Sequence, residues 1–147
     1  MEKRIRIGKL QPAAYKAMMA MEAYTSQTAI NPLHKELIRI RASQLNGCAY
    51  CLDMHTKDAR KLGETEQRLY LVAAWREATG IFTEEERSIL ALTEEVTLIQ
   101  NHVSDDTYRK ALAVLGDQLL AQVIMMIITI NMWNRIGVSQ QMLPGED

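Results

Sequence analysis

Two cysteines and one histidine near the middle of the chain are the residues best suited to chemistry. Cys48 and Cys51, the only cysteines among 147 residues, are separated by two positions, and His55 follows four positions later. Such a pair can cycle between dithiol and disulfide, or it can bind a metal. Glu36, on the preceding predicted helix, adds a carboxylate that could orient His55 or accept a proton through a water.

One helix, from about Cys48 to Leu62, is expected to carry both thiols and the imidazole on its apolar face. Residues three and four apart on a helix are neighbours, so Cys51 is placed beside both Cys48 and His55. A helix N-terminus and a nearby histidine both favour the thiolate form of cysteine. The helix dipole favours Cys48 as the attacking thiol, whereas His55 lies one turn from Cys51.

The rest of the sequence predicts a single all-α domain, residues 1–147, of about seven helices. No run of four to eight residues alternates like a strand between turns. The hydrophobic content of 48% is ordinary for a globular core. An extended lead-in is expected over residues 1–10, followed by helices near 13–24, 32–45, 48–62, 65–78, 83–100, 104–115 and 118–136.

Composition limits the partners. The net charge of −1 and the aromatic content of 5% argue against nucleic acid and anionic membrane surfaces. The most apolar stretch, Leu119–Trp133, is shorter than the ~20 residues of a membrane span, and its apolar faces predict a homo-oligomer. A cytoplasmic location is expected. Two histidines are expected to face solvent: His34 and His102. Three polar residues are expected to fix packing register between subunits: Asn131, Asn134 and Arg135.

The string Glu36-x11-Cys48-x2-Cys51-x3-His55 resembles the signature of AhpD-like alkylhydroperoxidases, within the carboxymuconolactone decarboxylase superfamily. The similarity is densest over Leu37–Gly63. It implies an all-α trimer, or a larger ring such as a hexamer, that reduces peroxides through its dithiol. It further implies that Cys51 attacks the peroxide, that Cys48 resolves the product and donates a proton, and that Glu36 and His55 form a proton relay.

The sequence therefore predicts a thiol-dependent peroxidase that needs no metal, haem or flavin. Its substrate would be an organic or hydrogen peroxide, and the resemblance suggests a lipoyl-bearing protein as the dithiol reductant. Tyr50 stands where family members carry a second histidine, which implies a shorter relay. Three alternatives stay open: two ordinary buried cysteines, a redox sensor without turnover, and a zinc site built from Cys48, Cys51, His55 and Glu36.

Overall fold

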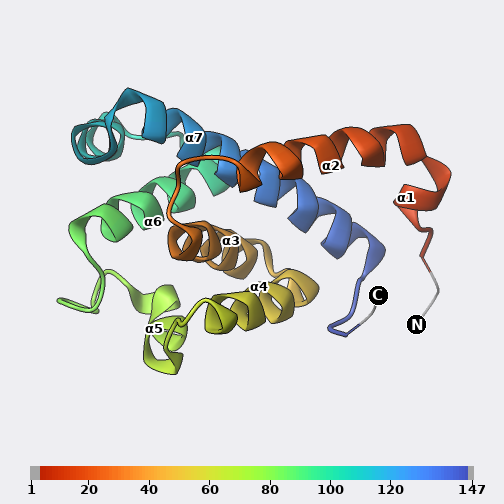
Figure 1. Ribbon diagram of the computed structural model, residues 1–147, viewed down its shortest axis with the longest axis horizontal. Coiled ribbons are helices and arrows are strands. Elements are labelled where there is room, and N and C mark those ends of the chain that lie inside the picture. Colours follow the sequence, from red (N-terminus) through yellow and green to blue (C-terminus); the bar gives the residue numbers. More distant parts are fainter. Residues whose placement is uncertain (1–3, 146–147) are drawn as a thin grey trace.

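The computed structural model describes residues 4–145, and within them the fold is all-α, as predicted (Figure 1). Seven α-helices are present in this part of the chain, with two short 3-10 turns at Val72–Ala74 and Ile99–Asn101. The helices are α1 (Ile7–Leu10), α2 (Pro12–Ser26), α3 (Pro32–Asn46), α4 (Ala49–Lys61), α5 (Glu66–Leu71), α6 (Glu84–Thr97) and α7 (Asp105–Gln140).

Helix α3 lies at the centre and contacts α4, α6 and α7, while α2 lies along α7 (Figure 1). Both faces of α3 are buried. Ile38 and Ala42 belong to an apolar cluster shared with α6 and α7, and Leu37 and Ile40 belong to a second cluster shared with α4, α5 and α6. Because it is enclosed on both sides, α3 holds its side chains in fixed positions relative to α4 and α7.

Most helix starts follow the capping signals in the sequence. The Asn31 side chain accepts a hydrogen bond from Leu33 N, with Pro32 in the first turn. Thr83 and Glu86 form a complete capping box at the start of α6. At the other end of α3, Gly47 adopts the left-handed conformation, with φ at 66°, and stops the helix just before the cysteine pair.

The ends of several segments differ from the expectation. Ile7–Leu10 is helical rather than extended, and the N–H of Ile7 is bound by the side chain of Gln140. The helix expected over residues 65–78 gives way to a 3-10 turn after Leu71. In the loop that follows, Arg87 Nη1 donates to the carbonyl of Trp75, so this carbonyl is satisfied from another helix. Such long-range capping is invisible in local sequence.

The two last expected helices carry the single label α7, but they meet at a kink at the expected position, where Gly116 is non-helical, with φ at 73°. The helix also continues past the expected end at residue 136, to Gln140. Within residues 4–145, α7 is the one helix that could cross a membrane by length and composition, with a window of mean hydropathy 2.0. The expectation that this segment is too short is therefore wrong, although one such helix is weak evidence for a span. Only 28% of that window is buried inside the single chain.

A buried polar cluster fixes the register of α3 against α7. Asn46 Nδ2 donates to the side-chain oxygens of Asn131 and Asn134, both at 2.9 Å. Asn134 Nδ2 in turn donates to Ser43 Oγ at 2.9 Å, and Arg135 donates back to the Asn131 carbonyl. The sequence assigned this role to contacts between subunits. The structure places the contacts inside one chain.

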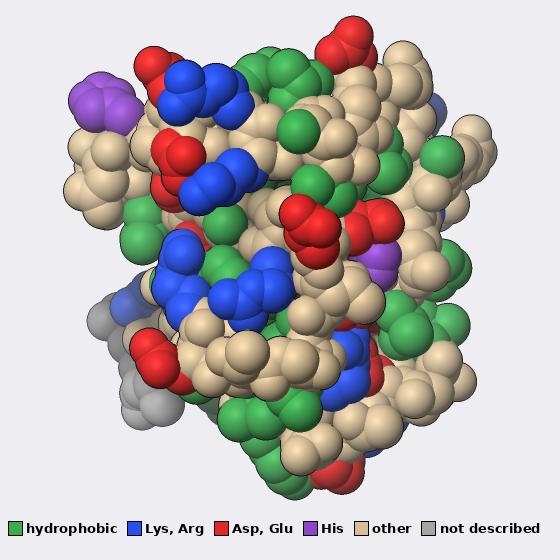
Figure 2. Space-filling model, turned by 90° about the vertical axis from the view of Figure 1, so that its left-hand side faces the viewer, with side chains coloured by type: hydrophobic (Ala, Val, Ile, Leu, Met, Phe, Trp, Pro, Cys, Tyr) green, Lys and Arg blue, Asp and Glu red, His purple; other side chains and the backbone are tan. Residues whose placement is uncertain are grey.

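Charged side chains of both signs lie interspersed with apolar ones on the face shown in Figure 2. This mixture agrees with the net charge of −1.

Candidate active site

Cys48 and Cys51 form a disulfide at the start of α4. Cys48 is the N-cap residue, with extended backbone angles, so it precedes the helix rather than beginning it. Its Sγ accepts a hydrogen bond from Cys51 N–H at 3.4 Å, and the two Cα atoms are 5.3 Å apart. Both residues are buried. The helix N-terminus therefore points one of its free N–H groups, that of Cys51, at the sulfur of Cys48.

Helix α7 packs its backbone directly against the disulfide at Gly137. A Cβ at this position would lie 2.9 Å from Cys48 Sγ and 3.5 Å from Cys51 Sγ. A contact below 3.0 Å forces atoms to shift, so only glycine fits here without displacing the sulfurs. The sequence analysis gave Gly137 no role, because nothing local to it indicates a neighbour almost ninety residues earlier.

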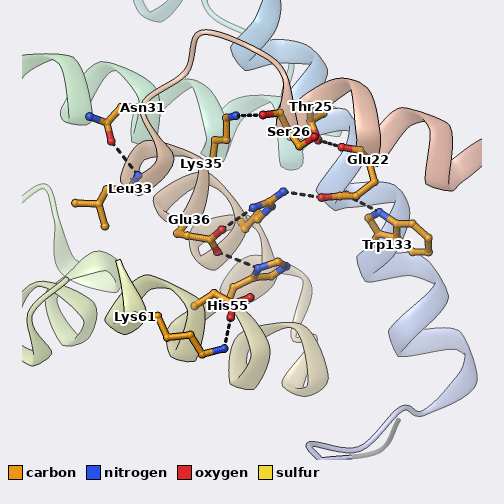
Figure 3. A network of polar contacts seen from close by, with 12 residues as sticks. Glu22, Thr25, Ser26, Asn31, Leu33, Lys35, Glu36, His55, Lys61 and Trp133 are labelled. Atoms are coloured by element: carbon orange, nitrogen blue, oxygen red, sulfur yellow. Dashed lines mark hydrogen bonds and ion pairs between the residues drawn. The ribbon is translucent and has the colours of Figure 1, made fainter. Parts of the chain in front are cut away.

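Glu36 and His55, the two predicted relay residues, meet between α3 and α4. Glu36 Oε2 lies 3.0 Å from His55 Nδ1, and Glu36 is 5% exposed (Figure 3). Arg39 Nη1 donates to the other oxygen, Glu36 Oε1, at 2.5 Å. Because the carboxylate accepts from both sides, the Nδ1 position of His55 carries the proton, which leaves Nε2 free to accept one.

The polar chain continues beyond the residues that the sequence identified. Arg39 Nη2 donates to Glu22 Oε1 at 2.6 Å, and Trp133 Nε1 donates to Glu22 Oε2 at 3.0 Å (Figure 3). The chain thus links four helices: α7, α2, α3 and α4. The spacing of Arg39 three residues after Glu36 is a usable sequence signal for that pair. The partners on α2 and α7 have no comparable signal.

An apolar cavity of about 350 Å³ opens onto one side of the disulfide, and we name it the Cys51 cavity. Cys51 and His55 line it together, and Cys48 does not. Tyr50 also lines this cavity, although the helical wheel places it on the flank away from His55. The remaining lining residues come from α2, α3, α4, α7 and the segment after α7: Tyr15, Met19, Glu22, Arg39, Met54, Asp58, Trp133, Ile136, Gly137 and Met142.

The other two histidines lie away from this cavity. His102 is exposed, in agreement with the sequence. His34 is not solvent-facing as expected: its side chain is 13% exposed and lies 3.3 Å from Glu85 and 3.6 Å from Glu86. Within residues 4–145 no group of three or more His, Cys, Asp or Glu side chains is arranged to hold a metal ion.

Comparison with known proteins agrees with this architecture. The sequence model of the carboxymuconolactone decarboxylase family matches residues 12–95. The uncharacterized protein YdfG of Bacillus subtilis is 44% identical over 140 residues, which is 95% of each chain.

Several solved structures are similar, and two of them show the range of the match. A protein of unknown function from Agrobacterium tumefaciens, described as a "Putative Antioxidant Defence Protein AhpD", is 36% identical, with a TM-score of 0.93 over 99% of this chain and 100% of that one. An uncharacterized peroxidase-related protein from Silicibacter sp. TM1040 shares the fold at 21% identity, with a TM-score of 0.78 over 88% of this chain and 69% of that one. The match of sequence and fold confirms the resemblance seen in the cysteine motif: this chain belongs to the carboxymuconolactone decarboxylase family.

Proposed function

We propose that the protein reduces organic or hydrogen peroxides by cycling Cys48 and Cys51 between dithiol and disulfide. The observation that carries the proposal is a buried disulfide at the wall of an apolar cavity, which it shares with a histidine held by a carboxylate. Family membership and the description of the Agrobacterium structure as an AhpD protein support it.

In the proposed reaction, the Cys51 thiolate attacks one peroxide oxygen and the O–O bond breaks. The departing alcohol or water takes a proton, and Cys51 becomes a sulfenic acid. The Cys48 thiolate then attacks the Cys51 sulfur, water leaves, and the disulfide forms. Each turnover transfers two electrons from the two thiols to the peroxide. His55 takes the thiol proton at Nε2 and returns it to the leaving oxygen, and Glu36 is the residue that positions it.

Two observations support different tasks for the two sulfurs. Cys48 Sγ accepts the N–H of Cys51 at the helix N-terminus, which favours a thiolate at Cys48. Cys51 lines the same cavity as His55, and only there can a small substrate reach a thiol beside a base. We therefore assign peroxide attack to Cys51, because access and intrinsic nucleophilicity count as well as acidity.

A turnover assay with several dithiol donors, among them a lipoyl-bearing protein, tests the activity. We expect steady consumption of peroxide by the reduced protein and loss of two thiols per chain without covalent dimers. Oxidation that stops after one equivalent, despite excess dithiol, would instead indicate a redox sensor.

Single Cys→Ser variants test the assignment of the sulfurs. Cys48→Ser should leave a trappable sulfenic acid on Cys51 after peroxide treatment, because its resolving partner is gone. Cys51→Ser should react slowly or not at all. The opposite labelling pattern would exchange the two roles.

A further inference from the structure

A second cavity, of about 390 Å³, opens onto the other side of the disulfide. Cys48 lines it and Cys51 does not, so we name it the Cys48 cavity. Gly137 and Met142 line both cavities, and the Gly137 backbone lies against both sulfurs. The end of α7 and the turn after it therefore border both cavities, and each cavity is lined by a different cysteine.

The direction of thiol–disulfide exchange makes this division important. A thiolate displaces one sulfur from another by approaching in line, from the side opposite the sulfur that leaves. Attack on Cys51 must therefore come through the Cys51 cavity. Attack on Cys48 must come from the side away from Cys51, and the Cys48 cavity is the one that Cys48 lines without Cys51.

The two cavities also differ in charge. Arg4 is the one charged side chain among the described residues that line the Cys48 cavity, and it is anchored by donating to the Ser139 carbonyl at 2.9 Å. The N-terminus of α4, at Cys48 and Ala49, adds positive potential to this cavity, whereas the C-terminal end of α7, at Val138 and Gln141, adds negative potential. Among the described lining residues, Arg4 therefore supplies the full charge that an incoming anion meets.

The Cys51 cavity has the opposite balance. Glu22 and Asp58 line it; its one guanidinium, on Arg39, is already shared between Glu22 and Glu36, and Asp58 is paired with the exposed Lys61 at 2.9 Å. Its charged groups would repel an incoming thiolate, whereas an uncharged peroxide is indifferent to them.

We propose that the thiol reductant attacks the disulfide at Cys48 through the Cys48 cavity, while peroxide reaches Cys51 through the other cavity. The inference rests on the proposed function, which supplies the disulfide as a product. The reductant thiolate bonds to Cys48 Sγ, the S–S bond breaks, and Cys51 leaves as a thiolate. The second thiol of the reductant then attacks the reductant sulfur that is bonded to Cys48, and the mixed disulfide breaks. The proton of that second thiol passes to Cys48, and the reductant departs as a disulfide. Two electrons pass from the reductant to the protein.

This direction of attack restores Cys51 directly as the thiolate, beside His55 and in the peroxide cavity. The mixed disulfide sits on Cys48, outside that cavity. A bulky dithiol carrier can therefore reduce the protein without occupying the space that the peroxide needs.

Trapping the mixed disulfide tests the inference. Oxidised wild-type protein is mixed with 2-mercaptoethanesulfonate, an anionic monothiol, quenched with N-ethylmaleimide at increasing times, and mapped by fragmentation mass spectrometry. At the earliest times we expect the sulfonate adduct on Cys48 and the maleimide on Cys51. An adduct mainly on Cys51, an equal split, or a disulfide that the monothiol does not open would each overturn the proposal.

A charge variant tests the role of the cavity wall. The measured quantity is the ratio of disulfide reduction rates by 2-mercaptoethanesulfonate and by the cationic monothiol cysteamine. Arg4→Glu should lower this ratio about fivefold or more at low salt, with the effect shrinking at high salt. Lys9→Glu changes the same charge on exposed α1, outside both cavities, and should change the ratio far less. An unchanged ratio in Arg4→Glu would contradict the inference.

Neither measurement uses peroxide. If the reduced protein fails to consume peroxide, the proposed function fails, while the site of thiolate attack is still read directly.

Discussion

Replacing Glu36 by glutamine should invert the tautomer of His55. In the structure one carboxylate accepts from both Arg39, at 2.5 Å, and His55 Nδ1, at 3.0 Å. A glutamine offers one acceptor oxygen and one NH₂ donor. The guanidinium of Arg39 can only donate, so it captures the oxygen and turns the NH₂ group toward His55. His55 must then accept at Nδ1, and its proton moves to Nε2, which can no longer act as a base.

The size of the effect follows from what a positioned base contributes. General acid–base catalysis typically accelerates a reaction by ~10²–10⁴, so we expect the rate of Cys51 oxidation to fall at least about 100-fold. At about 1.36 kcal/mol for each factor of ten, this corresponds to about 2.7 kcal/mol of transition-state stabilisation. The fold should persist, because the side chain keeps its shape and Arg39 keeps its bond to Glu22 at 2.6 Å.

Single-turnover stopped flow measures this rate without interference from the reductant. Pre-reduced Glu36→Gln protein is mixed with excess peroxide, and thiol loss is followed beside the wild type. Glu77→Gln, on an exposed glutamate far along the chain, provides the matched control. A folded Glu36→Gln protein that is oxidised within about threefold of the wild-type rate would refute the reasoning about the His55 tautomer.

Three further predictions concern stability and assembly. Gly137→Ala should destabilise the oxidised protein by up to about 2 kcal/mol, because overpacking costs ~1–3 kcal/mol and the gain in helix propensity returns only about 1 kcal/mol. Urea titrations measure this change, with Ser139→Ala as the control. A Gly137→Ala protein as stable as the wild type, or more stable, would contradict the clash. Burial raises the pKa of Glu94, but hydrogen bonds from Trp75, Arg76 and Arg41 outweigh it and hold the pKa below its usual value. The stability from this carboxylate is therefore present at neutral pH and lost as the pH falls below about 4.5. The urea midpoint of Glu94→Gln should accordingly depend less on pH in that range than the midpoint of the wild type. An unchanged pH dependence would show that Glu94 contributes nothing. Finally, light scattering should give three or six times the chain mass of 16.7 kDa. Ile128→Glu, at a 46% exposed position on α7, should reduce that mass. A wild-type monomer at micromolar concentration would contradict the predicted oligomer.

Local signals made much of the fold predictable. Asn31 before Pro32, and Thr83 three residues before Glu86, are caps whose partners lie within one turn. Cys51 and His55 share α4 and Cys48 is its N-cap, so their neighbourhood also followed from spacing. The same reasoning placed Glu36 near His55 only as one of several possibilities, since that contact joins two helices.

The parts that sequence did not predict all depend on packing between distant elements. Gly137 touches the sulfurs from α7, and Glu22 reaches Arg39 from α2. Beyond the early end of the helix that follows Thr65, Arg87 of α6 binds the carbonyl of Trp75, a contact that local sequence does not show. A helical wheel describes only one helix, so it misplaced Tyr50, which faces a cavity whose opposite wall comes from α2 and α7.

The position of Trp133 gives the site an optical reporter. Its indole lines the Cys51 cavity and is held in one orientation by Glu22, whereas the chain's other tryptophan, Trp75, is buried elsewhere against Glu94. A nearby disulfide quenches indole emission by accepting an electron, and a dithiol does so less. The intrinsic fluorescence of a Trp75→Phe protein should therefore follow the redox state of the cysteine pair in real time, without an added dye, so that both halves of the proposed cycle can be timed in one cuvette.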